Sequence, residues 1–185
     1  AAVAGSAHGA TFFVDAGAGN DANAGTSAAQ PFLTIQKAID EAVVRTGPDM
    51  IQIAEGQYPE NLTIQDPDAV TLSGASGVEI VAAASSDAIH IKLGDVTISN
   101  LTVTGGKNGI YAAGAEDAPL HLTVRNVASV ANAGRGLRAV DVRDVTISDC
   151  RFLDNGNDDG IKVVTKTLDR TSANLSIRDT VVSGC

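Results

Sequence analysis

Two stretches of the chain, DVTISNLTVTGGKNGIYA (Asp95–Ala112) and DVTISDCRFLDNGNDDGIKV (Asp144–Val163), are copies of one sequence repeat. Each begins with DVTIS, continues through a polar residue to a turn rich in glycine and asparagine, and ends with a strand-like segment that starts Gly-Ile. Self-similarity at a period of about 20 to 50 residues is typical of solenoids, in which each repeat is one structural unit. The repeat therefore decides the fold.

Four copies of the first half of this repeat align on one polar position. The copies are VTISNLTV, LTVRNVAS, VTISDCRF and LSIRDTVV, and the polar position falls on Asn100, Asn126, Asp149 and Asp179. The spacings between these positions are 26, 23 and 30 residues. Apolar residues alternate before each of them, which indicates a strand with one buried face. Because Asn and Asp tolerate left-handed backbone, we expect a one-residue bend and a ladder of stacked polar side chains.

Another strand follows the glycine turn of each copy. Its segments are AIHI, GIYA, GLRA and GIKV, which begin at Ala88, Gly109, Gly136 and Gly160. Since every copy runs in the same order and direction, the copies stack as parallel coils about 4.8 Å apart. The sequence thus predicts an all-β protein, a single-stranded parallel β-helix of about five to six coils.

The segment before the repeats has a helical pattern instead. Thr34 is a suitable N-cap, Gly47-Pro48 a stop, and the apolar positions between them are Ile35, Ala38, Ile39, Ala42 and Val43. We expect an amphipathic helix of about three turns that covers the open end of the first coil. The chain is interpreted as one domain, with an N-terminal segment, first strand and capping helix at 1–48 and β-helix coils, ending mid-coil, at 49–185.

Composition sets limits on the partners and on the cysteines. The net charge of -9 and pI near 4.6 disfavour binding to nucleic acid or to an anionic membrane surface. No apolar run approaches the roughly 20 residues that a membrane-spanning helix needs, so no membrane insertion is expected. Cys150 and Cys185 lack the spacing of a zinc or redox motif, and we interpret them as structural thiols.

The N-terminal segments carry a family resemblance. PFLTIQKAI (31–39), followed by GQYPENLTI (56–64), is similar to the first strands and helix of the right-handed, pectate-lyase-like β-helix superfamily. The resemblance implies a right-handed β-helix, a secreted or cell-surface location and a cleft for acidic polysaccharide along the third strand of each coil and the turn before it.

Strand alternation places a set of polar side chains on that same surface. The position after each inward Ile or Leu of the third strand points outward, and it holds His90, Tyr111, Arg138 and Lys162. The preceding turns supply Asp87, Lys107, Asn108, Arg135, Asp158 and Asp159. We expect Tyr111, Asn108, Arg135 and Lys107 to bind substrate.

The resemblance implies β-elimination or epimerisation of uronic acids, with Lys162 as the base and Arg138 as its charge partner. Proximity to Arg138 disfavours the charged form of Lys162, whereas the nearby carboxylates favour it, and the sequence does not decide between these effects. Asp158 and Asp159 are the expected Ca²⁺ ligands. His90 is a candidate general acid or base because its ordinary pKa is near neutrality.

An alternative is a non-catalytic module that binds glycan or assembles on a surface, with its open C-terminal coil packed on a partner chain. The small number of coils and the lack of a complete catalytic signature favour this alternative, and the sequence leaves open whether the site is catalytic. We interpret the open end as that of a fragment of a longer β-helix; self-association, or a closure that the sequence does not show, are the other possibilities.

Overall fold

The computed structural model describes residues 9–115, 120–156, 159–165 and 174–185. Within these ranges the chain forms one helix, α1 (Ile35–Val43), and parallel strands that belong to one continuous sheet. The strands are β1 (Thr11–Val14), β2 (Asp49–Ile53), β3 (Gly56–Tyr58), β4 (Leu62–Gly74), β5 (Val78–Val81), β6 (Ile89–Thr104), β7 (Ile110–Ala113), β8 (Leu120–Val130), β9 (Leu137–Val140), β10 (Asp144–Ser148), β11 (Arg151–Leu153), β12 (Ile161–Val164), β13 (Asn174–Arg178) and β14 (Val181–Ser183).

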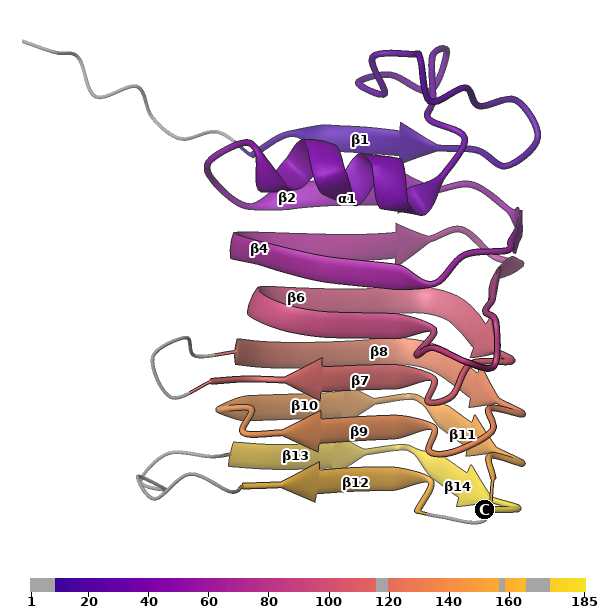
Figure 1. Cartoon of the computed structure of the whole chain (residues 1–185), viewed down its shortest axis with the longest axis vertical. Helices are drawn as coiled ribbons and strands as arrows, with labels where there is room; N and C mark the ends of the chain where they lie inside the picture. The colour runs from indigo at the N-terminus through magenta and orange to yellow at the C-terminus, as the bar shows by residue number, and fades with distance from the viewer. Residues whose placement is uncertain (1–8, 116–119, 157–158, 166–173) are drawn as a thin grey trace, which may run out of the picture.

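The strands stack in three columns, which Figure 1 shows as rungs below α1. The first column contains β2, the second half of β4, the middle of β6, the first half of β8, β10 and β13. The second column contains β3, β5, the ends of β6 and β8, β11 and β14. The third column contains the first parts of β4 and β6, then β7, β9 and β12. The predicted parallel β-helix is confirmed.

The first column keeps one register through the repeats, whereas the pairing of β4 with β6 shifts register between Ile64 and Ala69, where the third column passes into the first. Successive turns pair Val70 with Val96, Val96 with Leu122, Leu122 with Val145, and Val145 with Leu175. These pairs span four full turns, slightly fewer than the expected count of about five to six coils.

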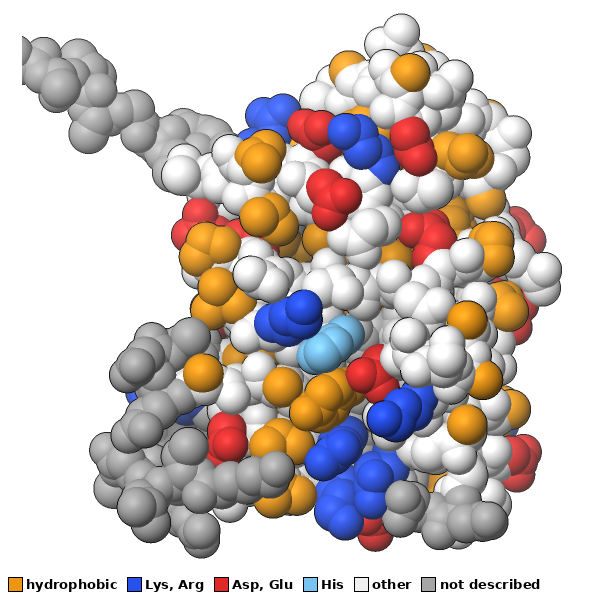
Figure 2. Space-filling view, in the orientation of Figure 1, with side chains coloured by type: hydrophobic (Ala, Val, Ile, Leu, Met, Phe, Trp, Pro, Cys, Tyr) orange, Lys and Arg blue, Asp and Glu red, His pale blue; other side chains and the backbone are white. Residues whose placement is uncertain are grey.

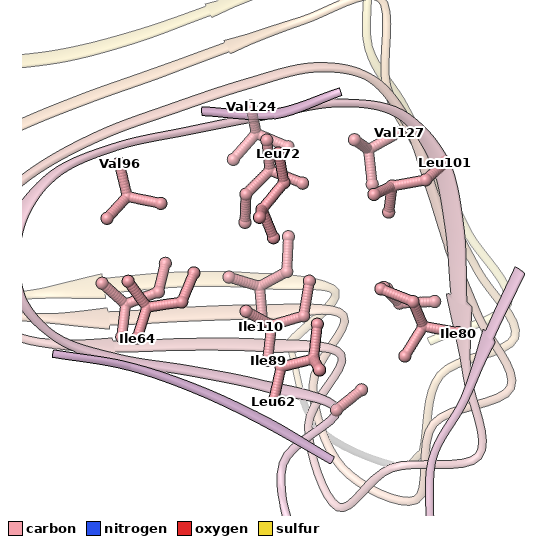
Figure 3. Close-up of a cluster of buried hydrophobic side chains, with 14 of the residues drawn as sticks. Leu62, Ile64, Leu72, Ile80, Ile89, Val96, Leu101, Ile110, Val124 and Val127 are labelled. Carbon is pink, nitrogen blue, oxygen red and sulfur yellow. The ribbon is translucent and has the colours of Figure 1, made fainter. Parts of the chain in front are cut away.

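The core is a narrow prism of aliphatic side chains from all three columns. In Figure 3, Leu72, Val96 and Val124 of the first column face Leu62, Ile64, Ile89 and Ile110 of the third, while Ile80, Leu101 and Val127 close the remaining side. All are 5% exposed or less. Small and β-branched side chains suit this space because the two facing sheets lie close together.

The bend between the first and second columns follows the prediction. Asn100, Asn126, Asp149 and Asp179 have φ of 58°, 48°, 57° and 47°. Asn126 Nδ2 donates a hydrogen bond to Asn100 Oδ1 at 2.9 Å, so the expected ladder of polar side chains is seen between these two rungs. A single residue with left-handed backbone is enough to bend the chain from one column into the next. Both flanking strands then keep their apolar side chains in the core.

The capping helix is also where the sequence placed it. The Thr34 hydroxyl accepts a hydrogen bond from Lys37 N, and the buried face consists of Ile35, Ala38, Ile39 and Ala42. The backbone N–H groups of Ile35 and Gln36 donate to the Glu60 carboxylate at 2.9 Å. Satisfying these first N–H groups joins the helix to the turn that precedes β4.

Candidate functional site

Four of the predicted site residues form one row on the outer face of the third column. The strand registers pair His90 of β6 with Tyr111 of β7, Tyr111 with Arg138 of β9, and Arg138 with Lys162 of β12. Parallel neighbours in a sheet are about 4.8 Å apart, so residues 21 to 27 positions apart in the sequence lie side by side. We call this set the outer row.

The upper half of the outer row is a stack of rings. The ring centroids of His90 and Tyr111 are 4.9 Å apart with a 38° tilt, and Arg138 Cζ lies 5.2 Å from the Tyr111 centroid. Such contacts hold a guanidinium against an aromatic ring. Tyr111 therefore presents a ring between an imidazole and a cation.

The lower half of the row is a network of charges. Asp159 Oδ2 lies 3.1 Å from Lys162 Nζ and 3.5 Å from Arg135 Nε. The hydrogen bond from Lys162, followed by its charge and by Arg135, lowers the pKa of the Asp159 carboxyl. Figure 2 shows basic side chains gathered on this face below a histidine. Arg135 thus lies beside Lys162 through a shared carboxylate.

The expected Ca²⁺ site is not formed by the described residues. Asp158 lies outside them, and Asp159 is engaged by two cationic side chains instead. Across the described part of the chain, no group of three or more His, Cys, Asp or Glu side chains could hold a metal ion. Calcium binding by Asp158 and Asp159 therefore stays a prediction.

A hollow of about 300 Å³ lies beside the upper end of the row. Its lining consists of Asn61, Leu62, Thr63, Ser85, Ser86, Asp87, His90 and Lys107. Asn61 fixes one wall, because its Nδ2 donates to Asp87 O at 3.0 Å and its Oδ1 accepts from Ala83 N at 3.1 Å. The predicted residues His90 and Lys107 thus meet at a shaped surface.

His90 is held in this wall in a way that favours its neutral form. Its Nδ1 lies 4.0 Å from Asp87 Oδ2, and its side chain is 31% exposed. Burial, which outweighs the attraction to Asp87, lowers the pKa of His90. At neutral pH the imidazole is therefore uncharged and able to accept a proton.

Asn108 corrects one expectation, because it does not face a ligand. It is 4% exposed, its Nδ2 donates to Asp87 Oδ1 at 2.6 Å, and its Oδ1 accepts from Arg135 N at 3.1 Å. Both ends of the amide are thus used to hold neighbouring coils together. Asn108 positions Asp87 and the backbone of Arg135.

A buried pair of amide side chains, Asn132 and Asn155, was not predicted from the sequence. Asn132 and Asn155 are each 2% exposed, and Asn132 Nδ2 donates to Asn155 Oδ1 at 2.9 Å. Asn132 Oδ1 also accepts from Gly106 N at 3.0 Å, and Asn155 Nδ2 donates to Ser129 O at 2.9 Å. The available signal was their spacing of 23 residues, which equals the distance from Asn126 to Asp149.

Comparisons with known proteins agree with this architecture. The chain belongs to the family described as the right handed beta helix region, which matches residues 58–185. It is similar to a cell surface glycoprotein of Methanothermus fervidus, with 34% identity over 96 residues that cover 52% of this chain and 16% of that protein. The expected right-handed β-helix is therefore confirmed.

Two solved structures share the architecture. Pectin methylesterase PemA from Erwinia chrysanthemi matches with a TM-score of 0.60 and 18% identity, covering 94% of this chain and 66% of that chain. A pectin methylesterase in complex with hexasaccharide VII matches with a TM-score of 0.57 and 18% identity, covering 93% and 65%. At this identity the likeness shows the fold alone. Within the described residues, no helix is long and apolar enough to cross a membrane.

Proposed function

We propose that this chain is an exported β-helical protein that binds an acidic polysaccharide along the outer face of the third column. The observation that carries the proposal is the row His90, Tyr111, Arg138 and Lys162, flanked by Arg135 and Lys107, on a protein of net charge -9. Gathering cations on one face of an acidic protein focuses a local positive potential there. An anionic chain is attracted to that face and repelled elsewhere.

The geometry suits an extended ligand more than a compact one. The rungs repeat about every 4.8 Å along the axis, and the residues of the outer row follow one another with no gap in register. Tyr111 offers a ring against which a sugar packs, while Arg138 and Lys162 offer donors to carboxylates. A protein of similar fold, a pectin methylesterase, is known in complex with a hexasaccharide, which supports a saccharide as the ligand.

If the protein is catalytic, the reaction we propose is β-elimination or epimerisation of uronic acids. Lys162 Nζ lies 3.1 Å from the Asp159 carboxylate at the lower end of the outer row, where it is placed to bind a substrate carboxylate. His90, whose pKa is lowered by burial, is then the better proton acceptor. Arg138 supplies the second positive charge beside the carboxylate.

Binding and catalysis are tested separately. Affinity for a polyuronate, measured by calorimetry, is expected to fall about tenfold in Arg138→Ala, the size of one lost charge-assisted hydrogen bond. Arg125→Ala is the matched control because Arg125 is an exposed arginine of the first column. Equal affinity in the two variants refutes the assignment of this face.

The catalytic step has its own readout. Incubation with a polyuronate, with and without Ca²⁺, is expected to produce unsaturated ends that absorb ultraviolet light. Loss of this signal in His90→Ala with retained binding supports proton transfer by His90, and loss in Lys162→Ala alone supports Lys162 as the base. If the protein binds the polyuronate but forms no unsaturated product, the result supports a non-catalytic binding module.

The second candidate is a non-catalytic assembly module, which a surface at the last strands favours. Leu175, Ile177, Val181 and Val182 are between 44% and 53% exposed. We propose that these side chains of β13 and β14 pack on a partner chain or on a second copy. Analytical ultracentrifugation is expected to show a concentration-dependent dimer that Ile177→Asp disrupts, and a monomer at all concentrations contradicts self-association.

A further inference from the structure

Asn100 lies on a different side of the β-helix from the outer row and combines two properties. It opens the sequence Asn100-Leu101-Thr102, an Asn-x-Thr acceptor pattern for N-linked glycans. It also sits at the exposed left-handed bend between the first and second columns, with φ 58°. The bend turns Asn100 and Thr102 toward solvent while Leu101 is only 5% exposed.

The amide nitrogen of Asn100 has no partner among the described residues, for a reason that the register explains. Asn100 is the top rung of its ladder: its Oδ1 accepts from Asn126 Nδ2 at 2.9 Å, and the position above it is Gly74. Glycine has no side chain to accept a hydrogen bond, so Asn100 Nδ2 is left without one in the described part of the chain. A ladder position disfavours a glycan, because the ladder hydrogen bonds occupy the amide groups. At Asn100, the top rung, the ladder uses only Oδ1, and Nδ2 stays available.

Space for a sugar is present at the same place. A surface hollow of about 460 Å³ is lined by Asn100, Thr102, Asn126 and Asp149, and by Gly74 with the loop residues Ser76 and Gly77. Thr102 is partly exposed, and the residues beside it on the neighbouring rungs are Glu79 and Ala128. Both groups that the acceptor pattern requires are therefore accessible.

Two other sites with the same pattern serve as comparisons. In Asn61-Leu62-Thr63, Asn61 Nδ2 donates to Asp87 O at 3.0 Å and its Oδ1 accepts from Ala83 N, so a sugar there displaces the 83–87 turn. In Asn174-Leu175-Ser176, Asn174 Nδ2 donates to Asp144 Oδ1 at 2.7 Å. Of these three asparagines, Asn100 is thus the one whose Nδ2 makes no hydrogen bond to a described residue, so a glycan can be attached there without breaking one.

We propose that Asn100 carries an N-linked glycan. In the reaction, a bond forms between Asn100 Nδ2 and the anomeric carbon of a lipid-diphosphate-linked oligosaccharide. The bond from that carbon to the phosphate oxygen breaks, the lipid diphosphate leaves with the electron pair, and the amide loses one proton to the transferase. The proposal rests on the export proposed above, since such transferases act on the outer side of a membrane.

The test is glycopeptide mass spectrometry on the chain recovered from outside cells that carry N-glycosylation machinery. A hexose-containing mass increment is expected on the Asn100 peptide, with occupancy highest at Asn100 and lowest at Asn61. Thr102→Ala abolishes the increment while keeping Asn100 and its ladder, and Asn61→Gln leaves it unchanged. Recovery of the chain outside the cell measures export directly, so failure of export is distinguished from failure of modification.

A matched variant tests the role of the free nitrogen. The substitution Ala128→Thr completes a new Asn-x-Thr pattern that begins at Asn126, on the next rung, where Asn126 Nδ2 is bonded to Asn100 Oδ1. Occupancy at Asn126 in this variant is expected to be at least tenfold below that at Asn100 in the unsubstituted chain, which is the reference because residue 128 lies beside Thr102. An exported chain with unmodified Asn100, or with Asn61 or the new Asn126 site occupied more fully than Asn100, overturns the proposal.

Discussion

The buried amide pair gives the sharpest prediction about stability. Asn132→Ala, in the turn before β9, removes the acceptor for Gly106 N and the donor to Asn155 Oδ1, which belong to the corresponding turns of the two neighbouring coils. Asn155 Oδ1 keeps its bond from Asn132 N, so the main loss is one buried N–H without a partner. An unsatisfied buried donor costs about 1–3 kcal/mol, and the small cavity and lost pair add to this. We expect the free energy of unfolding to fall by about 3 kcal/mol.

The assay is equilibrium unfolding in urea, followed by circular dichroism. The control is Asn126→Gly, which removes an exposed amide hydrogen bond while keeping the left-handed bend, and is expected to cost less than about 1 kcal/mol. If the two variants lose the same amount, the buried pair has no special role and the reasoning from burial is wrong.

Three further predictions follow from single side chains. Asp66 is fully buried, and its Oδ2 has no hydrogen-bond partner among the described residues. Burial raises the pKa of the Asp66 carboxyl, so the folded state binds this proton more tightly than the unfolded state does. The free energy of unfolding therefore falls as the pH rises through that pKa. Asp66→Asn is therefore expected to flatten the pH dependence of unfolding and to add about 1 kcal/mol at pH 7; a steeper dependence contradicts this. Asp159→Asn removes a negative charge beside Lys162 and Arg135 and is expected to strengthen polyuronate binding in calorimetry, whereas weaker binding refutes the charge argument. Phe152→Ala is expected to lower stability by about 3–5 kcal/mol in thermal unfolding, because the ring is fully buried against Gly136; a loss below about 1 kcal/mol is inconsistent with this packing.

The sequence predicted the columns because each strand alternates with period two and each coil repeats the last. The bends at Asn100 and Asp149 followed from the residue types that tolerate left-handed backbone. The outer row was predictable for the same reason, since parity along a strand decides which side chains point outward. Register then brought His90 beside Tyr111 without any further assumption.

Side-chain positions in the turns were less predictable, because the alternation of inward and outward side chains stops where a strand ends. Asn108 was read as exposed, but its turn directs the amide into the space between coils. The buried Asn132 and Asn155 have the composition of ordinary solvent-facing turns, and only their hydrogen bonds reveal their place. The pairing of Asp159 with Arg135 joins two coils, and side-chain contacts of that kind leave no mark in a single repeat.

Each turn of the β-helix contributes one side chain to the outer row. The length of this surface therefore increases with the number of turns that the gene encodes. The pair Val96 and Leu122 shows that one turn is a segment of 26 residues that begins and ends in the same register. Duplicating such a segment in frame adds one rung to the core and one position to the face, without moving the rungs on either side. Genetic recombination can therefore lengthen or shorten the surface proposed to bind ligand in steps of one rung, with the hydrophobic interior continuous throughout.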